Sequence, residues 1–324
     1  MPFNKLLRWF LVGSVIFFIF GCGSKHSNQE KKNTHLIIFH AGSLSNPMKE
    51  IIADYKKVHP DVEIFTEIGG SVECARKITE LNKPCDVFVS ADYKVIENLL
   101  IPKYASWNIS FASNEMVIAY RDNSAHSVQI NSDNWMSILS DKEVRIGRSD
   151  PNSDPCGYRT VLLTQLAERY YHVPGLSKRL LQNSQRDIRP KEVDLLAMLE
   201  TGNVDYLYIY KSIAIQHRLK YISLPPEINL SDPNFNNLYA TASIAINGSA
   251  PGETKVQKGE AMQYSITIPL NGKNKLLAED FVGYFLSKDL GLSVIRKHGQ
   301  QILAPLKVHG YKSLPQSIKA KIEQ

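Results

Sequence analysis

Residues 149–159 read SDPNSDPCGYR and separate two segments with different hydrophobic patterns. Residues 144–147 form a short apolar run, which predicts a β-strand. From residue 158 to residue 170, apolar side chains recur at helical spacing, which predicts an amphipathic helix. The stretch is therefore predicted to be a strand-to-helix loop, the kind of connection from which α/β folds are built.

The second half of this loop has the chemistry of a helix start. Asp154 suits the N-cap position, and Pro155 suits the first helical position. The N–H groups of Cys156 and Gly157 are then expected to be free at the helix end, where they attract anions. The simpler alternative is that Asp154 only caps its own helix.

Two earlier loops share this design. Strands and helices are predicted to alternate, beginning with a strand, over residues 36–39, 44–55, 62–65, 72–81 and 86–89. This order predicts a parallel sheet covered by helices. Gly42-Ser43 and Gly70-Ser71 follow the first two strands, at the sheet edge where α/β proteins bind ligands. Each serine alone is better explained as a cap or turn residue, but three such loops together predict a converging anion site.

The rest of the chain repeats the α/β pattern. Further strands are predicted at residues 116–120, 205–210 and 264–269, helices at 191–200 and 276–286, and a hairpin tip at 247–259. The late strand indicates that the chain returns to its first half. We therefore predict two lobes, one formed by residues 33–112 with 260–324 and the other by residues 113–259.

The first 21 residues are organised as a signal peptide. Lys5 and Arg8 precede an apolar core at residues 11–20, which is too short for an ordinary transmembrane helix. Gly21-Cys22 resembles the cleavage point of a lipoprotein signal. We expect residues 1–21 to be removed, Cys22 to carry lipid, and residues 22–32 to form a polar tether. A plain secretion signal is the alternative.

The composition is that of a globular protein with room for two domains: 324 residues, 43% hydrophobic and 22% charged. Loss of Lys5 and Arg8 with the signal leaves 36 basic residues against 32 acidic ones, from 38 against 32 in the whole chain. No Lys/Arg block indicates a nucleic-acid partner, and a mild positive charge does not oppose an anionic ligand. The mature chain keeps three cysteines besides Cys22, namely Cys74, Cys85 and Cys156, with no zinc-site spacing.

Several motifs occur in the order known from one family. They are Phe39–Leu44, Gly70–Glu73, Asp86-Val87 with Ala91-Asp92-Tyr93, Asn114–Tyr120, Ser149–Arg159 and Leu224–Leu230. From about His35 to about Pro305 the chain resembles the tungstate/molybdate-binding proteins of ABC importers. The resemblance implies an α/β, two-lobed periplasmic-binding-protein fold of type II, with the oxyanion in the cleft between the lobes.

The resemblance also implies the site residues. The oxyanion contacts would come from Gly42, Ser43, Ser71, Asp154, Pro155, Cys156 and Tyr210, and the ligands to its metal centre from Asp154 and Glu192. Buried carboxylates beside a dianion make sense if they are protonated, paired with a cation, or bonded to the central metal. Tungsten(VI) and molybdenum(VI) are hard centres that accept carboxylate oxygens, whereas sulfur in sulfate and phosphorus in phosphate do not readily do so. Taken alone, Glu192 fits a helix-dipole role, and Tyr210 fits the core.

The expected function is therefore binding without catalysis or a cofactor. A monomeric extracytoplasmic lipoprotein would close its lobes on tungstate or molybdate and deliver it to a permease and an ATPase.

Three alternatives stay open. The same fold could bind sulfate or phosphate, or it could bind iron(III) through acids and Tyr206, Tyr208 and Tyr210, although alternate residues of one strand favour packing. A thiol hydrolase at Cys156 would need His40 or His172 as its base, and neither lies in a catalytic motif.

The N-terminal pattern generates the first prediction. Mass spectrometry of the membrane-extracted protein should find a mature chain that begins at Cys22 and carries a diacyl group on that cysteine, because one acyl chain alone anchors weakly. A soluble mature form that begins at another residue would contradict the lipoprotein assignment.

Overall fold

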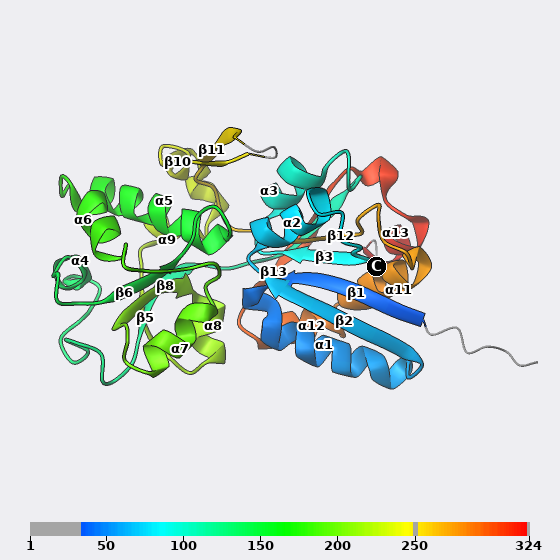
Figure 1. Cartoon of the computed structure of the whole chain (residues 1–324), viewed down its shortest axis with the longest axis horizontal. Helices are drawn as coiled ribbons and strands as arrows, with labels where there is room; N and C mark the ends of the chain where they lie inside the picture. The colour runs from blue at the N-terminus through cyan, green and yellow to red at the C-terminus, as the bar shows by residue number, and fades with distance from the viewer. Residues whose placement is uncertain (1–33, 249–251, 323–324) are drawn as a thin grey trace, which may run out of the picture. The chain divides into compact units, whose positions relative to one another are not determined.

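The computed structural model describes residues 34–248 and 252–322; the predicted signal peptide, Cys22 and the tether lie outside them. Strands from both ends of this range form a six-stranded sheet, called sheet A here (Figure 1). In spatial order its strands are β13 (Gln301–His309), β4 (Asn108–Ser113), β12 (Tyr264–Thr267), β3 (Val87–Ser90), β1 (Thr34–Ala41) and β2 (Val62–Gly69).

Sheet A is mixed. Its strand β1 pairs in parallel with β2 and β3, as the strand–helix alternation predicts, and β1 carries the fully buried side chains of Leu36 and Ile38. The late strand β12 inserts between β3 and β4 and is antiparallel to both. The C-terminal part of the chain therefore lies inside sheet A rather than beside it.

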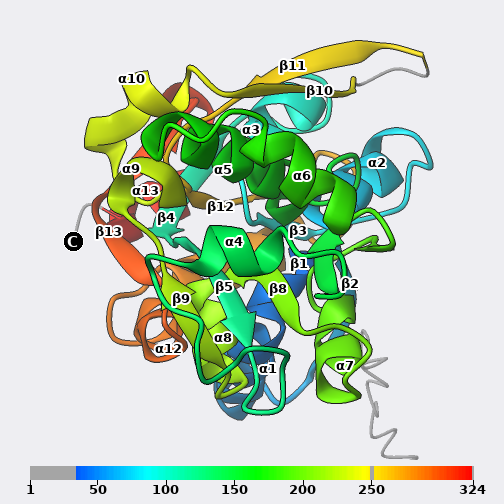
Figure 2. The same ribbon diagram turned by 90° about the vertical axis from the view of Figure 1, so that its left-hand side faces the viewer.

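A second, five-stranded sheet, called sheet B, is built from the middle of the chain. In spatial order its strands are β7 (Asp187–Arg189), β6 (Ile146–Ser149), β8 (Tyr206–Tyr210), β5 (Met116–Tyr120) and β9 (Lys220–Ser223). Helices cover both faces of sheet B, with α5 and α6 on one face and α7 and α8 on the other (Figures 1 and 2). Because both faces are covered, every residue of β8 is buried.

The remaining described elements are helices and one hairpin. The hairpin pairs β10 (Ser243–Asn247) with β11 (Thr254–Lys258). The helices packed about sheet A are α1 (Ser45–Val58), α2 (Ser71–Thr79), α3 (Tyr93–Val95), α11 (Lys275–Phe285), α12 (Gly291–Lys297) and α13 (Gln316–Ile322). The others are α4 (Trp135–Leu139), α5 (Pro155–Tyr170), α6 (Leu176–Asn183), α7 (Asp194–Glu200), α8 (Lys211–Gln216), α9 (Pro226–Asn229) and α10 (Asn236–Tyr239). Four short helical turns complete the set: η1 (Gly42–Leu44), η2 (Ile96–Leu100), η3 (Pro233–Phe235) and η4 (Tyr311–Ser313).

The structure differs from the expected elements at several points. The strand expected from residue 144 begins at Ile146, and the helix expected from residue 191 begins at Asp194. The sequence pattern predicted no element at residues 301–309, where the structure has β13, a strand that contains Pro305, which cannot donate to a sheet ladder. The structure tolerates this proline because β13 lies at the edge of sheet A and its register shifts between Ile302 and Lys307.

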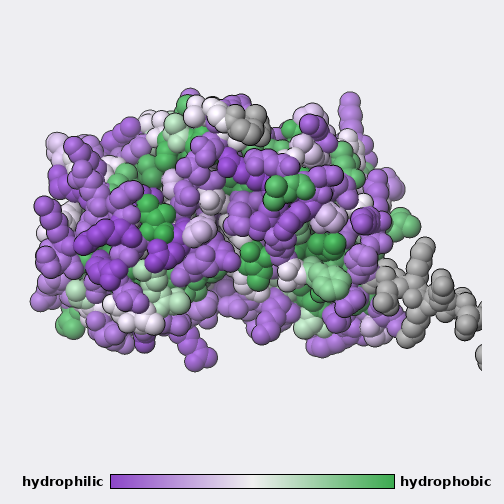
Figure 3. All heavy atoms as spheres, in the orientation of Figure 1, coloured by the Kyte–Doolittle hydropathy of each residue, from purple (hydrophilic) through white to green (hydrophobic). Residues whose placement is uncertain are grey.

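The described surface is mostly hydrophilic on the face drawn in Figure 3, where apolar side chains occur in small groups. Within residues 34–248 and 252–322, no helix combines the length and apolar character that crossing a membrane requires.

The lobe boundaries stay a prediction, and the strand order sharpens their test. A fragment of residues 33–112 lacks β12, which separates β3 from β4 in sheet A. We expect this fragment to show no cooperative thermal transition by circular dichroism, because its sheet cannot close without the missing strand. A stable fragment that unfolds in two states would contradict the proposed lobes.

Candidate functional site

Two buried carboxyl groups lie together at the centre of the candidate site. Asp154 is the N-cap of α5, and its Oδ1 accepts a hydrogen bond from the Cys156 N–H at 3.2 Å. Its Oδ2 accepts a second one from the Glu192 N–H at 3.0 Å. Each of the two residues exposes only 1% of its surface. The structure therefore brings together the two acids that the sequence assigned to a metal centre.

The Glu192 side chain points towards the first loop of sheet A. A Cβ built on Gly42 would lie 3.4 Å from Glu192 Oε1 and 2.9 Å from a methyl group of Val193, so glycine permits this close approach. Neither Oε1 nor Oε2 of Glu192 has a hydrogen-bond partner of ordinary geometry. Because unbonded buried carboxyl oxygens are costly, this arrangement indicates a group reserved for a ligand.

Burial changes the acidity of both carboxyls. Desolvation raises the pKa of Glu192 well above its usual range, and the neighbouring Asp154 carboxyl raises it further. Desolvation also raises the pKa of Asp154, against hydrogen bonds from the backbone N–H groups of Cys156 and Glu192 that lower it. Without a ligand, the pair therefore favours at least one bound proton.

Three hydroxyl groups of the predicted site, those of Ser43, Ser71 and Tyr210, are buried, and each already accepts a hydrogen bond. Ser71 Oγ accepts from the Ala91 N–H at 2.9 Å, and Ser43 Oγ accepts from the Tyr264 hydroxyl at 3.1 Å. The Tyr210 hydroxyl accepts from Arg159 Nη1 at 2.8 Å. Since a hydroxyl has a single proton, each of the three keeps that proton available for a further acceptor. The site is therefore rich in donors despite its acids.

The loop at residues 149–154 lies directly against α2. A Cβ on Gly70 would lie 2.2 Å from the Ser153 carbonyl oxygen, which leaves room only for glycine. The same carbonyl accepts a hydrogen bond from the Glu73 N–H at 3.1 Å. Part of the N-terminus of α2 is therefore occupied by the Ser153 carbonyl group, which leaves fewer N–H groups there for an anion.

The N–H groups at the start of α5 are not free, which corrects the expectation from the sequence. The Cys156 N–H donates to Asp154 Oδ1, and the Gly157 N–H donates to the Asp154 carbonyl oxygen at 3.0 Å. Asp154 captures both groups because an N-cap side chain and backbone satisfy the first helical donors. Pro155 has no N–H, so the first turn of α5 offers less to an anion than expected. Ligand contacts by Pro155 and Cys156 stay predictions.

Cys156 lacks the lowered thiol pKa of an activated nucleophile. Its Sγ donates to the Tyr208 carbonyl oxygen at 3.6 Å. Desolvation, with Asp154 and Glu192 nearby, raises the thiol pKa well above its usual range. His40, one of the two bases considered, is buried, and its Nδ1 lies 2.9 Å from the Ala41 carbonyl oxygen. Cys74, Cys85 and Cys156 are all buried free thiols.

The tyrosines of β8 do not form a common iron site. Tyr206 donates to the Ala125 carbonyl oxygen, Tyr210 accepts from Arg159, and the Tyr208 hydroxyl has no partner. Burial raises the pKa of Tyr208 and Tyr210, which opposes the phenolate form that iron(III) needs. In the described part of the chain, no group of three or more His, Cys, Asp or Glu residues is arranged to hold a metal ion.

The sequence did not indicate some of the residues that support the candidate site. Arg159 is the last residue of the loop motif at residues 149–159, but the sequence did not indicate its role. Tyr264 and Asn114 form a chain behind Ser43, in which Asn114 Nδ2 donates to the Tyr264 hydroxyl at 3.0 Å and to the Ser212 hydroxyl at 2.7 Å. No local signal could have identified Tyr264, because it lies about 220 residues from Ser43 in the sequence.

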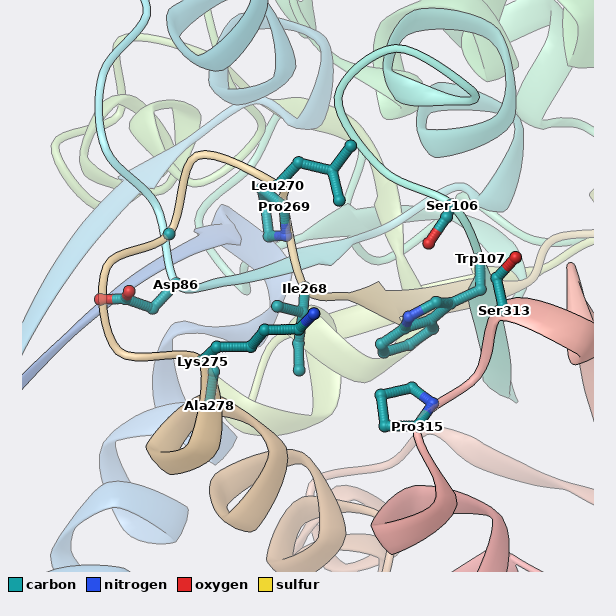
Figure 4. Close-up of a pocket in the computed structure, with 11 residues that line it drawn as sticks. Asp86, Ser106, Trp107, Ile268, Pro269, Leu270, Lys275, Ala278, Ser313 and Pro315 are labelled. Atoms are coloured by element: carbon teal, nitrogen blue, oxygen red, sulfur yellow. The ribbon is translucent and has the colours of Figure 1, made fainter.

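A separate small cavity, of about 80 Å³, lies beside β12 and α11 (Figure 4). It contains none of the candidate ligand residues. Its acid, Asp86, already accepts hydrogen bonds from the backbone N–H groups of Ile37, Lys273 and Asn274. Asp86 therefore joins β1 to the start of α11, which is a structural role.

Known proteins share features of the sequence and the fold of this chain. Residues 36–301 match the family described as bacterial extracellular solute-binding proteins. The chain belongs to that family. Members of this family bind solutes outside the cytoplasm.

Relatives of this solute-binding protein cover most of its length. An uncharacterized solute-binding protein of Petrotoga mobilis is 44% identical over 285 residues, which is 88% of each chain. The molybdate/tungstate-binding protein WtpA of Pyrococcus abyssi is 36% identical over 338 residues, which is 96% of each chain. The periplasmic molybdate-binding protein of Azotobacter vinelandii has a TM-score of 0.60 at 17% identity and covers 82% of this chain and 98% of its own. The type II periplasmic-binding-protein fold expected from the sequence is confirmed.

The carboxyl pair generates a prediction about stability. The pKa of Glu192 is higher in the folded state than its ordinary value of 4.5, so folding is penalised as the pH rises above that value. Ligand-free Glu192→Gln should therefore be more stable than the parent at pH 8, because the amide removes the cost of burying a carboxyl that would otherwise ionise. The difference should shrink as the pH falls through 4.5 and disappear well below it, where the carboxyl is protonated in both the folded and the unfolded state. Urea denaturation over this pH range measures it.

Glu200→Gln is the matched control, because Glu200 ends α7 and is exposed. It should leave the pH dependence of unfolding as in the parent. Parallel stability–pH curves for the parent and Glu192→Gln would show that Glu192 titrates normally in the folded protein.

Proposed function

We propose that this solute-binding protein captures tungstate or molybdate outside the cytoplasm and delivers it to the permease and ATPase of an ABC importer. The proposal includes a lipid anchor at Cys22, a monomeric state, and no catalytic activity. Its WtpA relative, named for molybdate and tungstate, supports the choice of ligand.

One observation carries the proposal. Asp154 and Glu192 are both buried, as are the hydroxyl groups of Ser43, Ser71 and Tyr210, and neither Glu192 carboxyl oxygen has a hydrogen-bond partner of ordinary geometry. A site for sulfate, which carries no proton at neutral pH, would use donors alone, because a buried carboxylate repels such a dianion. The combination suits an oxyanion whose central atom accepts carboxylate oxygens, which is a property of molybdenum(VI) and tungsten(VI).

The protein groups then divide into two roles. Ser43, Ser71 and Tyr210 donate their free hydroxyl protons to the oxygens of the oxyanion. Asp154 and Glu192 lose any bound proton and place their oxygens against the central atom. Because binding needs the deprotonated pair, affinity should fall as the pH is lowered.

Access requires movement. Ser43, Ser71, Asp154, Glu192 and Tyr210 each expose at most 1% of their surface. A ligand reaches them only when the contacts between the sheet A loops and α5 open. Opening and closing around a solute is the established behaviour of two-lobed binding proteins.

Four variants test the proposal. Asp154→Asn and Glu192→Gln should each weaken tungstate binding by about ten- to a hundredfold, since an amide oxygen is a poorer, neutral ligand. Both should let sulfate gain relative to tungstate. Ser43→Ala and Ser71→Ala should weaken all tetrahedral oxyanions more evenly, because they contact only oxygens. Calorimetric titration with tungstate, molybdate, sulfate and phosphate measures each variant.

A simple oxyanion cradle makes the opposite prediction. In that case the amide variants lose a repulsive charge, and they should bind every dianion as tightly as the parent or more tightly. That result would disprove metal coordination by Asp154 and Glu192. Tight sulfate binding by the unsubstituted protein, without tungstate binding, would disprove the proposed ligand.

A further inference from the structure

Arg159 connects the two halves of the site through one buried guanidinium group. Its Nη2 donates to Asp92 Oδ2 at 2.8 Å, and its Nη1 donates to the Ala91 carbonyl oxygen at 2.9 Å. The second proton of Nη1 goes to the Tyr210 hydroxyl at 2.8 Å. Arg159 exposes only 2% of its surface. All three acceptors are therefore held without competing water.

These acceptors belong to different parts of the fold. Ala91 and Asp92 directly follow β3 of sheet A, whereas Arg159 lies on α5 and Tyr210 ends β8 of sheet B. Tyr158, the neighbour of Arg159, also donates to Asp92 Oδ2, at 2.7 Å. Two neighbouring residues of α5 therefore bind the same buried carboxylate oxygen of the loop after β3.

The same contacts reach two hydroxyls of the candidate ligand site. Arg159 supplies the hydrogen bond that the Tyr210 oxygen accepts, so the phenolic proton is directed elsewhere. The Ala91 N–H supplies the bond that Ser71 Oγ accepts, while the Ala91 carbonyl is held by Arg159. Separation of sheet A from α5 would break the Arg159 bonds to Ala91 and Asp92.

We propose that Arg159 is the positioning residue that couples closure of the protein to ligand capture. Its guanidinium holds Ala91 and Asp92 against α5, and in the same geometry it orients the Tyr210 hydroxyl to donate to the bound oxyanion. This inference rests on the proposed function. It assigns a role to a residue that itself need not contact the ligand.

Lysine cannot replace arginine in this role. A guanidinium has five donors in a fixed plane and serves three acceptors at once, whereas an ammonium is a compact point charge on a flexible stem. Arg159→Lys keeps the positive charge beside Asp92 but loses the shared geometry. The substitution therefore tests whether the geometry of the guanidinium, rather than its positive charge, couples closure to ligand capture.

A double-mutant cycle with tungstate titration tests the coupling. Tyr210→Phe alone should weaken binding about tenfold, the loss of one charge-assisted hydrogen bond. Arg159→Lys should weaken it at least as much. The double variant should bind no more weakly than Arg159→Lys, because without Arg159 the Tyr210 hydroxyl is no longer oriented. Losses that multiply in the double variant would overturn the inference.

Closure gives a second, independent readout. On addition of tungstate, small-angle X-ray scattering should show the radius of gyration decreasing in the parent and in Tyr210→Phe. The decrease should be smaller in Arg159→Lys and in Asp92→Asn. A residue with a merely structural role would lower the melting temperature of the ligand-free variant without changing closure or affinity, and that result would overturn the inference.

Two further variants complete the design. Arg169→Lys is the matched control, because Arg169 lies on the same helix, is exposed, and donates to the Thr241 hydroxyl. It should bind and close like the parent. If Arg159→Lys does not fold, Asp92→Asn keeps Arg159, removes the negative charge that it contacts, and retains an oxygen that can still accept the α3 cap bond from the Lys94 N–H. Unchanged affinity and closure in that variant would overturn the inference. Absence of tungstate and molybdate binding by the parent would overturn the proposed function and the inference together.

Discussion

A buried ion pair between Arg159 and Asp92 is the contact on which the rest of this structure depends. Taking two charges out of water costs several kcal/mol for each ion, so such a pair persists only where further hydrogen bonds satisfy it. Here Tyr158, Tyr210 and the Ala91 carbonyl supply them. Because these partners come from both sheets, the network is complete only when the loops after β3 and the start of α5 are together.

Unlike the Arg159–Asp92 ion pair, the Asp154–Glu192 pair has no partner of opposite charge among the described residues. It is buried without a cation and with unbonded oxygens, so it destabilises the ligand-free protein at neutral pH. Binding proteins commonly accept such local instability where function requires a reactive group. In the proposed complex, the hydroxyls of the site donate to the outer oxygens of the ligand, while the two acids bind its central atom.

Fold alone does not select the ligand. The same architecture occurs in a sulfate-binding protein of Mycobacterium tuberculosis, with a TM-score of 0.57 at 12% identity. Ligand choice therefore depends on the few side chains at the loop ends. In this chain, the proposed selectivity depends on two buried acids, Asp154 and Glu192.

The sequence by itself determined the α/β class, the cap at Asp154 and the three small-residue loops, because these follow from local periodicity and turn chemistry. Family resemblance, rather than local pattern, singled out Glu192 and Tyr210. Only the tertiary structure decided that the α5 amides are satisfied by Asp154, that β13 tolerates Pro305 at a sheet edge, and that Tyr264 supports Ser43. Each of these depends on contacts between segments far apart in the chain or on competition for one hydrogen bond, which no short stretch of sequence encodes.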